Sequence, residues 1–65
     1  MDAFEEDLLT VGEENPADKV FRLFGIRINN SNAQKYLTGI RLYLKRRHEL
    51  PKDARPPEVL SYAQD

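Results

Sequence analysis

The sequence predicts an all-α fold: a small bundle of three helices, at about residues 3–11, 16–24 and 31–50, with a short C-terminal helix or turn at about 57–63. Two observations lead to this prediction. Apolar residues recur three and four positions apart, as they do on one face of a helix, and the segments are bounded by capping residues, glycine or proline. With 65 residues in all, the chain is expected to form a single small helical domain over residues 1–65.

The first helix is expected in the segment DAFEEDLLTVG. Asp2 is placed as its N-cap, and Glu5 follows three residues later, which is the spacing of a capping box. Gly12 provides a natural end. The apolar residues Phe4, Leu8 and Val11 then share one face. Because so short a helix is below the ~12–15 residues at which isolated helices become marginally stable, we expect it to dock on the rest of the chain.

The second helix has better boundary signals. Asn15 is suited to cap it, Pro16 takes the first position, where its missing N–H has no consequence, and Asp18 lies in the first turn beside the positive end of the dipole. Gly25 is expected to end the helix because glycine adopts a left-handed conformation readily. The apolar residues form one broad surface: Val20, Phe21, Leu23 and Phe24. The connector at 26–29 alternates apolar and polar residues and is expected to be extended.

The third helix has the strongest periodic pattern in the chain. Ser31 and Gln34 have the spacing of another capping box, and the helix is expected to run to about Leu50, just before Pro51. Gly39 lies beside the apolar stripe, where the lack of a side chain lets another element approach closely. The stripe follows one helix face: Ala33, Tyr36, Leu37, Ile40, Tyr43 and Leu44.

Residues 51–57, PKDARPP, contain three prolines and are expected to form an irregular, stiff connector. A last short helix then begins near Pro57, with Val59, Leu60 and Tyr62 as its apolar residues. The chain has no internal repeat and no low-complexity tract.

The net charge of −1 conceals a strong partition along the chain. Residues 1–18 hold seven acidic residues and no basic one, whereas residues 19–55 hold all ten basic residues and two acidic ones. Such asymmetry is typical of an acidic segment folded over a basic face, or of two faces offered to different partners. Residues 1–14 can also form a mobile acidic arm.

The composition argues against an enzyme. The chain has no cysteine and a single histidine, His48, so we expect no thiol nucleophile, no metal and no cofactor. Gly12, Gly25 and Gly39 are isolated, unlike the grouped glycines of a phosphate-binding loop. His48 lies in KRRHEL near the end of a helix, where an interaction with the helix dipole is more common than catalysis.

No apolar run approaches the roughly 20 residues of a membrane span. The first residues are acidic, unlike the basic start of a secretory signal. The absence of cysteine is compatible with a reducing compartment. We therefore expect a cytoplasmic protein that does not associate with membranes.

The third helix has a basic face that meets the electrostatic requirement for phosphate contacts. The segment VFRLFGI followed by NAQKYLTGIR resembles the two helices of helix-turn-helix DNA-binding proteins over residues 20–41, with a turn about two residues longer than the common pattern. The resemblance implies that the third helix enters the major groove. The residues placed at the DNA are Asn30, Asn32, Gln34 and Lys35, with Arg27 nearby. Against DNA stands the isoelectric point of about 5.8, because small DNA-binding domains commonly exceed about 9.

The same helix face is suited to a protein partner. Leu42 is expected in the middle of the polar face, where a leucine ringed by bases can anchor a binding surface while the charges steer an acidic partner. The slender core also favours association, including a homo-oligomer. The leading hypothesis is a non-enzymatic regulatory or adaptor protein that binds a larger protein with an acidic surface, and a helix-turn-helix-like transcriptional regulator is the alternative. The residues expected to contact the protein partner are Leu42, Lys45, Arg46, Arg41 and Lys35.

Overall fold

The computed structural model of the chain describes residues 3–10 and 12–63. In this part the chain forms four α-helices and no strand: α1 (Ala3–Leu9), α2 (Pro16–Phe24), α3 (Asn30–Arg46) and α4 (Val59–Ala63). A 3-10 turn, η1 (Arg47–Glu49), continues directly from α3. The prediction of a small all-α fold is confirmed.

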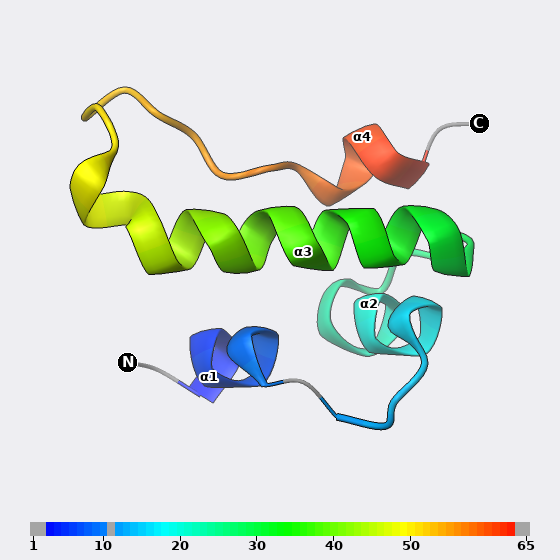
Figure 1. Cartoon of the computed structure of the whole chain (residues 1–65). Coiled ribbons are helices and arrows are strands. Elements are labelled where there is room, and N and C mark those ends of the chain that lie inside the picture. The colour runs from blue at the N-terminus through cyan, green and yellow to red at the C-terminus, as the bar shows by residue number, and fades with distance from the viewer. Residues whose placement is uncertain (1–2, 11, 64–65) are drawn as a thin grey trace.

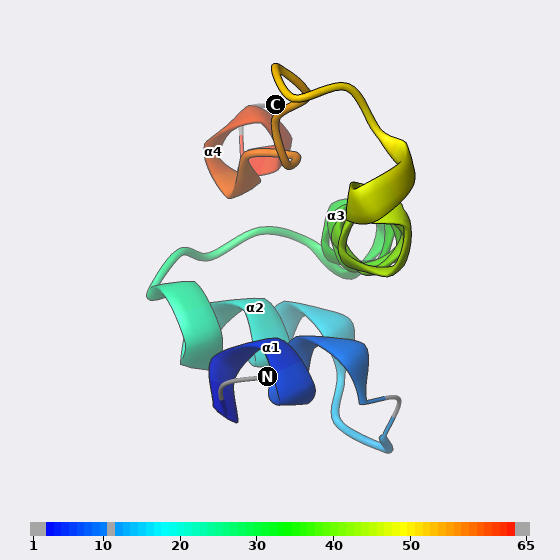
Figure 2. The ribbon, with the colours of Figure 1, turned by 90° about the vertical axis from the view of Figure 1, so that its left-hand side faces the viewer.

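Helix α3 is the axis of the molecule, and the other helices lie on two of its sides. Helices α1 and α2 lie together on one side and run across α3, which is clearest with α3 viewed end-on (Figure 2). After η1 the chain turns back and runs along the opposite side, so that α4 lies near the N-terminal end of α3 (Figure 1). One face of α3 is left between these two layers.

The core is built mainly on α3, as its periodicity predicted. Among the described residues, six apolar ones are buried, and four of them belong to this helix: Leu8, Val20, Ala33, Tyr36, Leu37 and Ile40. Tyr43 and Leu44, at the end of the predicted stripe, are partly buried. The stripe is therefore confirmed, with its deepest part in the N-terminal half of the helix.

A row of aromatic rings connects all four helices. Phe4 of α1 meets Phe24 of α2, Phe24 meets Tyr36 of α3, and Tyr36 meets Tyr62 of α4, each pair edge to face with centroids 5.5 Å apart. Such pairs contribute about 0.5–1.5 kcal/mol beyond the area they bury. The row explains how two helices as short as α1 and α4 are held against the longer ones.

Helix α2 has the predicted boundaries for the predicted reasons. The side chain of Asn15 accepts a hydrogen bond from the Ala17 N–H at 3.0 Å, and Pro16 is the first helical residue. Gly25 is left-handed, with φ of 73°, and its N–H donates to the Phe21 carbonyl at 2.7 Å.

The start of α3 differs from the prediction, because Asn29 caps the helix. The Asn29 side chain accepts from the Asn32 N–H at 2.8 Å, so α3 begins at Asn30 and Ser31 lies inside its first turn. The predicted Ser31–Gln34 capping box is therefore wrong. At the other end, the α-helix stops at Arg46 and the chain tightens into η1, short of the predicted end at Leu50.

The two terminal helices are shorter than predicted. Helix α1 ends at Leu9, and both the N–H and the hydroxyl of Thr10 bond to the Glu6 carbonyl in its last turn, at 3.0 and 2.8 Å. The proposed cap Asp2 and the proposed face residue Val11 lie outside the described residues. Helix α4 begins at Val59 instead of near Pro57, which belongs to the irregular segment before it.

The C-terminal segment packs on α3 at Gly39, the position beside the stripe where a close approach was predicted. A Cβ atom at this position would lie 3.4 Å from Cγ of Pro57 and 3.9 Å from the Tyr62 hydroxyl oxygen. The side chain of Asn32 adds a polar tie, donating to the Tyr62 carbonyl at 3.1 Å. The segment 57–62 is thus fixed to α3 by both apolar and polar contacts.

Candidate protein-binding face of helix α3

Helix α3 presents one continuous face to solvent, which we call the open face. Its members are exposed and recur three or four positions apart, so they lie in a row along the helix. They are Ser31, Gln34, Lys35, Thr38, Leu42, Lys45 and Arg46.

Leu42 is the apolar residue of the open face. Its side chain is 49% exposed although the other large apolar residues of α3 are buried or partly buried. The structure places Leu42 where the helical periodicity put it, away from the core. A single exposed leucine is common on protein surfaces, so its surroundings decide whether it marks a site.

Those surroundings are positive and unpaired. Within the part of the chain that the structure describes, Lys35, Lys45 and Arg46 make no ion pair and no side-chain hydrogen bond. Lys45 and Arg46 follow Leu42 by three and four residues, whereas Lys35 lies two turns before it. The open face therefore combines an apolar centre with three bases that are free to meet acidic groups.

Arg41, which the sequence grouped with these residues, lies elsewhere. Its side chain is partly buried beneath α1, where Nε donates to the Leu8 carbonyl at 2.8 Å and Nη2 to the Thr10 carbonyl at 3.4 Å. These carbonyls end α1 and have no partners within that helix. Arg41 thus caps α1, and we leave it out of the open face.

The residues that the helix-turn-helix resemblance placed at DNA are divided by the structure. Asn30 accepts a hydrogen bond from the Ala17 N–H at 3.2 Å, and Asn32 holds the Tyr62 carbonyl. The guanidinium of Arg27 lies 4.4 Å from the ring centre of Phe21. Asn30 and Asn32 would have to break these bonds before reading a base edge.

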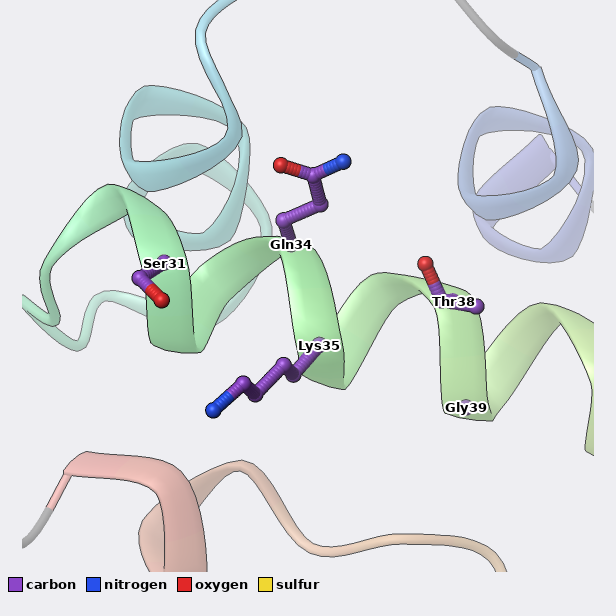
Figure 3. Close-up of a pocket in the computed structure, with 5 residues that line it drawn as sticks. All are labelled: Ser31, Gln34, Lys35, Thr38 and Gly39. Atoms are coloured by element: carbon purple, nitrogen blue, oxygen red, sulfur yellow. The ribbon is translucent and has the colours of Figure 1, made fainter.

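Gln34 and Lys35 remain on the open face. In Figure 3, Gln34 extends toward the side on which α1 and α2 lie, and Lys35 extends toward the side of α4. Together with Ser31, Thr38 and Gly39 they line a shallow hollow of about 510 Å³. The hollow lies over the N-terminal half of α3 and has hydroxyl, amide and ammonium groups at its rim, so it suits a polar or acidic side chain.

A second group of basic residues was not expected to act together. Lys19, Arg22 and Arg47, with Arg41, all converge on α1 from α2, α3 and η1. The signal for this arrangement was the charge partition, which is typical of an acidic segment folded over a basic face. In the structure these basic residues bond to the carboxylates of Glu5, Asp7 and Glu14 and to the carbonyls of Leu8 and Thr10.

Comparison with known proteins gives no match to a family model, to a curated protein or to a solved structure. In the part of the chain that the structure describes, no helix is both long and apolar enough to cross a membrane. The same residues include no group of three or more histidines and carboxylates placed to hold a metal ion. A functional proposal must therefore be argued from the open face of α3.

Proposed function

We propose that this protein is a non-enzymatic adaptor or regulator that binds an acidic surface of a larger protein through the open face of α3. Leu42 is the apolar anchor of this contact. Lys35, Lys45 and Arg46 form its rim and raise the rate of encounter with an acidic partner.

The observation that supports the proposal most is the unequal use of the basic residues. Four of them are engaged with the chain's own acids or carbonyls, namely Lys19, Arg22, Arg41 and Arg47. By contrast, the three on the open face lie on the same face of α3 as an exposed leucine and bind nothing within the described residues, as is also true of Lys52 and Arg55 on the connector. Exposed leucine costs free energy in water, and a partner that covers it recovers this energy.

The test compares two substitutions on the same face. Leu42→Asp should weaken partner binding roughly tenfold or more, because truncated or charged hot-spot residues have effects of this size. Gln34→Ala should leave the binding unchanged. The readout is retention of a specific protein from extracts of the source organism, quantified by mass spectrometry against the unmodified chain, with circular dichroism as the check on folding.

The second candidate is DNA binding through the exposed Gln34 and Lys35 at the N-terminal half of α3. Its support is the basic open face, which also suits phosphates. The pair of substitutions separates the two functions, because Gln34→Ala should impair base recognition while Leu42→Asp acts on a position outside the resembling segment. The engagement of Asn30 and Asn32 by main-chain groups favours the protein partner.

A further inference from the structure

The surface beneath α1 has the features of a receptor for an acidic helix, and we call it the α1 site. Leu8 is 2% exposed and packs in the core with residues of α2 and α3. Phe4, one helical turn earlier, packs edge to face on Phe24 at the border of the site. The apolar contact of α1 thus depends on two side chains four positions apart.

Charged contacts surround this apolar strip. The guanidinium of Arg47 donates to the Glu5 carboxylate at 2.9 Å, and Arg22 donates to both oxygens of Asp7 at 2.6 and 3.1 Å. The site is therefore positive on both flanks, and its two partners on α1 are acidic.

At one end of the α1 site, two basic residues contact the C-terminal end of α1. Lys19, which is only 5% exposed, donates to the Thr10 carbonyl at 2.6 Å, and Arg41 donates to the Leu8 carbonyl at 2.8 Å. Carbonyls at a helix C-terminus have no partners within the helix and concentrate negative charge. Two cations fixed at this point set both the direction and the end of the bound helix.

The resident helix is poorly suited to hold this site permanently. Helix α1 has seven residues, about half the length at which isolated helices become marginally stable. Arg22 and Arg47 are about half exposed, so solvent and salt screen part of their attraction to α1. Residues 12–15, which lead to α2, have no regular secondary structure. A longer helix with the same contacts has an advantage over α1 because it is itself more stable.

We propose that the α1 site is a second binding site, separate from the open face, for an acidic amphipathic helix of another protein, and that α1 occupies it until such a helix displaces it. The ligand needs an aromatic residue and a leucine four positions apart. It also needs carboxylates at the positions of Glu5 and Asp7. Its C-terminus lies over Lys19 and Arg41.

The test uses the chain's own α1 sequence as a probe in trans. A fluorescein-labelled peptide of residues 1–14 is titrated with the full chain, and binding is followed by fluorescence anisotropy. Against the unmodified chain, the peptide competes with a tethered helix whose effective concentration is in the mM range. Leu8→Ala in the chain weakens that internal competitor, so the peptide should bind this variant roughly tenfold or more tightly than the unmodified chain.

Reversing the charges of Arg47 in the chain and Glu5 in the peptide tests whether the peptide binds at the α1 site. Arg47→Glu in the Leu8→Ala chain removes the contact with Glu5 from the resident helix and from the peptide alike. A peptide carrying Glu5→Arg should therefore bind this chain severalfold more tightly than the peptide with Glu5. A peptide carrying Leu8→Asp should not bind. Leu42→Asp in the chain should leave the peptide affinity unchanged, which separates this result from the test of the open face. A loss with Leu42→Asp would place the peptide on the open face and overturn the proposal.

Two further measurements cover the remaining outcomes. If Leu8→Ala does not fold, Phe4→Ala replaces it, since Phe4 is 44% exposed. In the unmodified chain, peptide at about 1 mM should shift the amide resonances of α1 toward unfolded positions while those of α3 remain dispersed. No peptide binding by a folded variant would overturn the proposal. Dimers formed on mixing the unmodified and Leu8→Ala chains, detected as a doubled mass in light scattering, would make a second copy the occupant and overturn the assignment to another protein.

Discussion

At the residue scale, Gly39 marks the point where the C-terminal segment packs on α3. A Cβ atom there would meet Pro57 at 3.4 Å, an ordinary contact distance, so alanine fits. Because alanine favours a helix interior over glycine, Gly39→Ala should raise the free energy of unfolding by up to about 1 kcal/mol. Chemical denaturation measures the change.

Two further variants serve as comparisons for Gly39→Ala. Gly39→Leu should lower the free energy of unfolding by about 1–3 kcal/mol, because the larger side chain overlaps Pro57 and Tyr62. Gly12→Ala is the matched control, since a Cβ atom at Gly12 would have no neighbour within 4 Å and the residue is outside the helices. A neutral Gly39→Leu would show that the C-terminal segment does not pack on α3.

Tyr36 should make the free energy of unfolding depend on pH in the alkaline range. Burial, aided by the nearby Tyr62, raises the pKa of its phenol above the ordinary 10.0. The folded state therefore holds this proton more tightly than the unfolded chain, and the stabilisation is complete below pH 10.0 and is lost as the pH rises through the raised pKa. Between about pH 9 and about pH 11, the unmodified chain should lose more stability than Tyr36→Phe. Equal losses in denaturation experiments would contradict the assignment.

At the scale of the elements, the cap of α3 provides a test between neighbouring residues. The Asn29 side chain accepts from the Asn32 N–H, so Asn29→Ala should lower the free energy of unfolding by about 1 kcal/mol. Ser31→Ala should change it by less than about 0.5 kcal/mol, because Ser31 lies inside the first turn and is exposed. Thermal or chemical denaturation of the pair decides which residue is the cap, and the reverse order would restore the Ser31 capping box.

Arg22 connects α1, the following loop and α2 through its guanidinium. Hydrogen bonds from Arg22 hold the pKa of Asp7 below its ordinary 3.8 and that of Glu14 below its ordinary 4.5. Their contribution to stability is present above these ordinary values and is lost as the pH falls through the lowered pKa values. Between about pH 6 and about pH 3, the melting temperature of Arg22→Gln should therefore fall less than that of the unmodified chain.

The matched control for this acid dependence is Arg55→Gln, an exposed arginine on the connector before α4. This variant should show the same fall in melting temperature as the unmodified chain. If Arg22→Gln also shows it, the two carboxylates do not supply the acid sensitivity.

The elements differ in how far local sequence determined them. Asn15, Pro16 and Gly25 fix both ends of α2 by chemistry that acts within a few residues, and its bounds were predictable. Asn29 and Ser31 are both good caps, and the choice between them depends on packing, in which Asn30 reaches the Ala17 N–H of α2. Such a contact between distant residues is not encoded in a local pattern.

The candidate site shows the same limit. Helical periodicity sufficed to place Leu42, Lys45 and Arg46 on the outside of α3, because it depends only on the turn of the helix. It could not assign Arg41, which lies on the flank of the helix that α1 covers. Which flank receives a neighbour is decided by the path of the chain, and the charge partition only indicated that the acidic segment would seek a basic surface.

At the scale of the whole molecule, the acidic N-terminal part and the basic middle part neutralise each other unevenly. Ion pairs bring Glu5, Asp7 and Glu14 onto the basic residues around α1. The open face keeps its own three bases unpaired within the described residues. The net charge of −1 therefore describes the charge of neither the surface around α1 nor the open face. A local positive field remains along α3.

Titration with mixed-sequence duplex DNA at two salt concentrations tests the central claim most directly, because both candidate functions use the same bases and no partner needs to be known. The proposed protein-binding function predicts only weak, non-specific binding, with dissociation constants of roughly 10⁻⁴–10⁻⁶ M near physiological salt. Binding tighter than about 10⁻⁸ M that falls steeply between about 50 and 200 mM salt would contradict it.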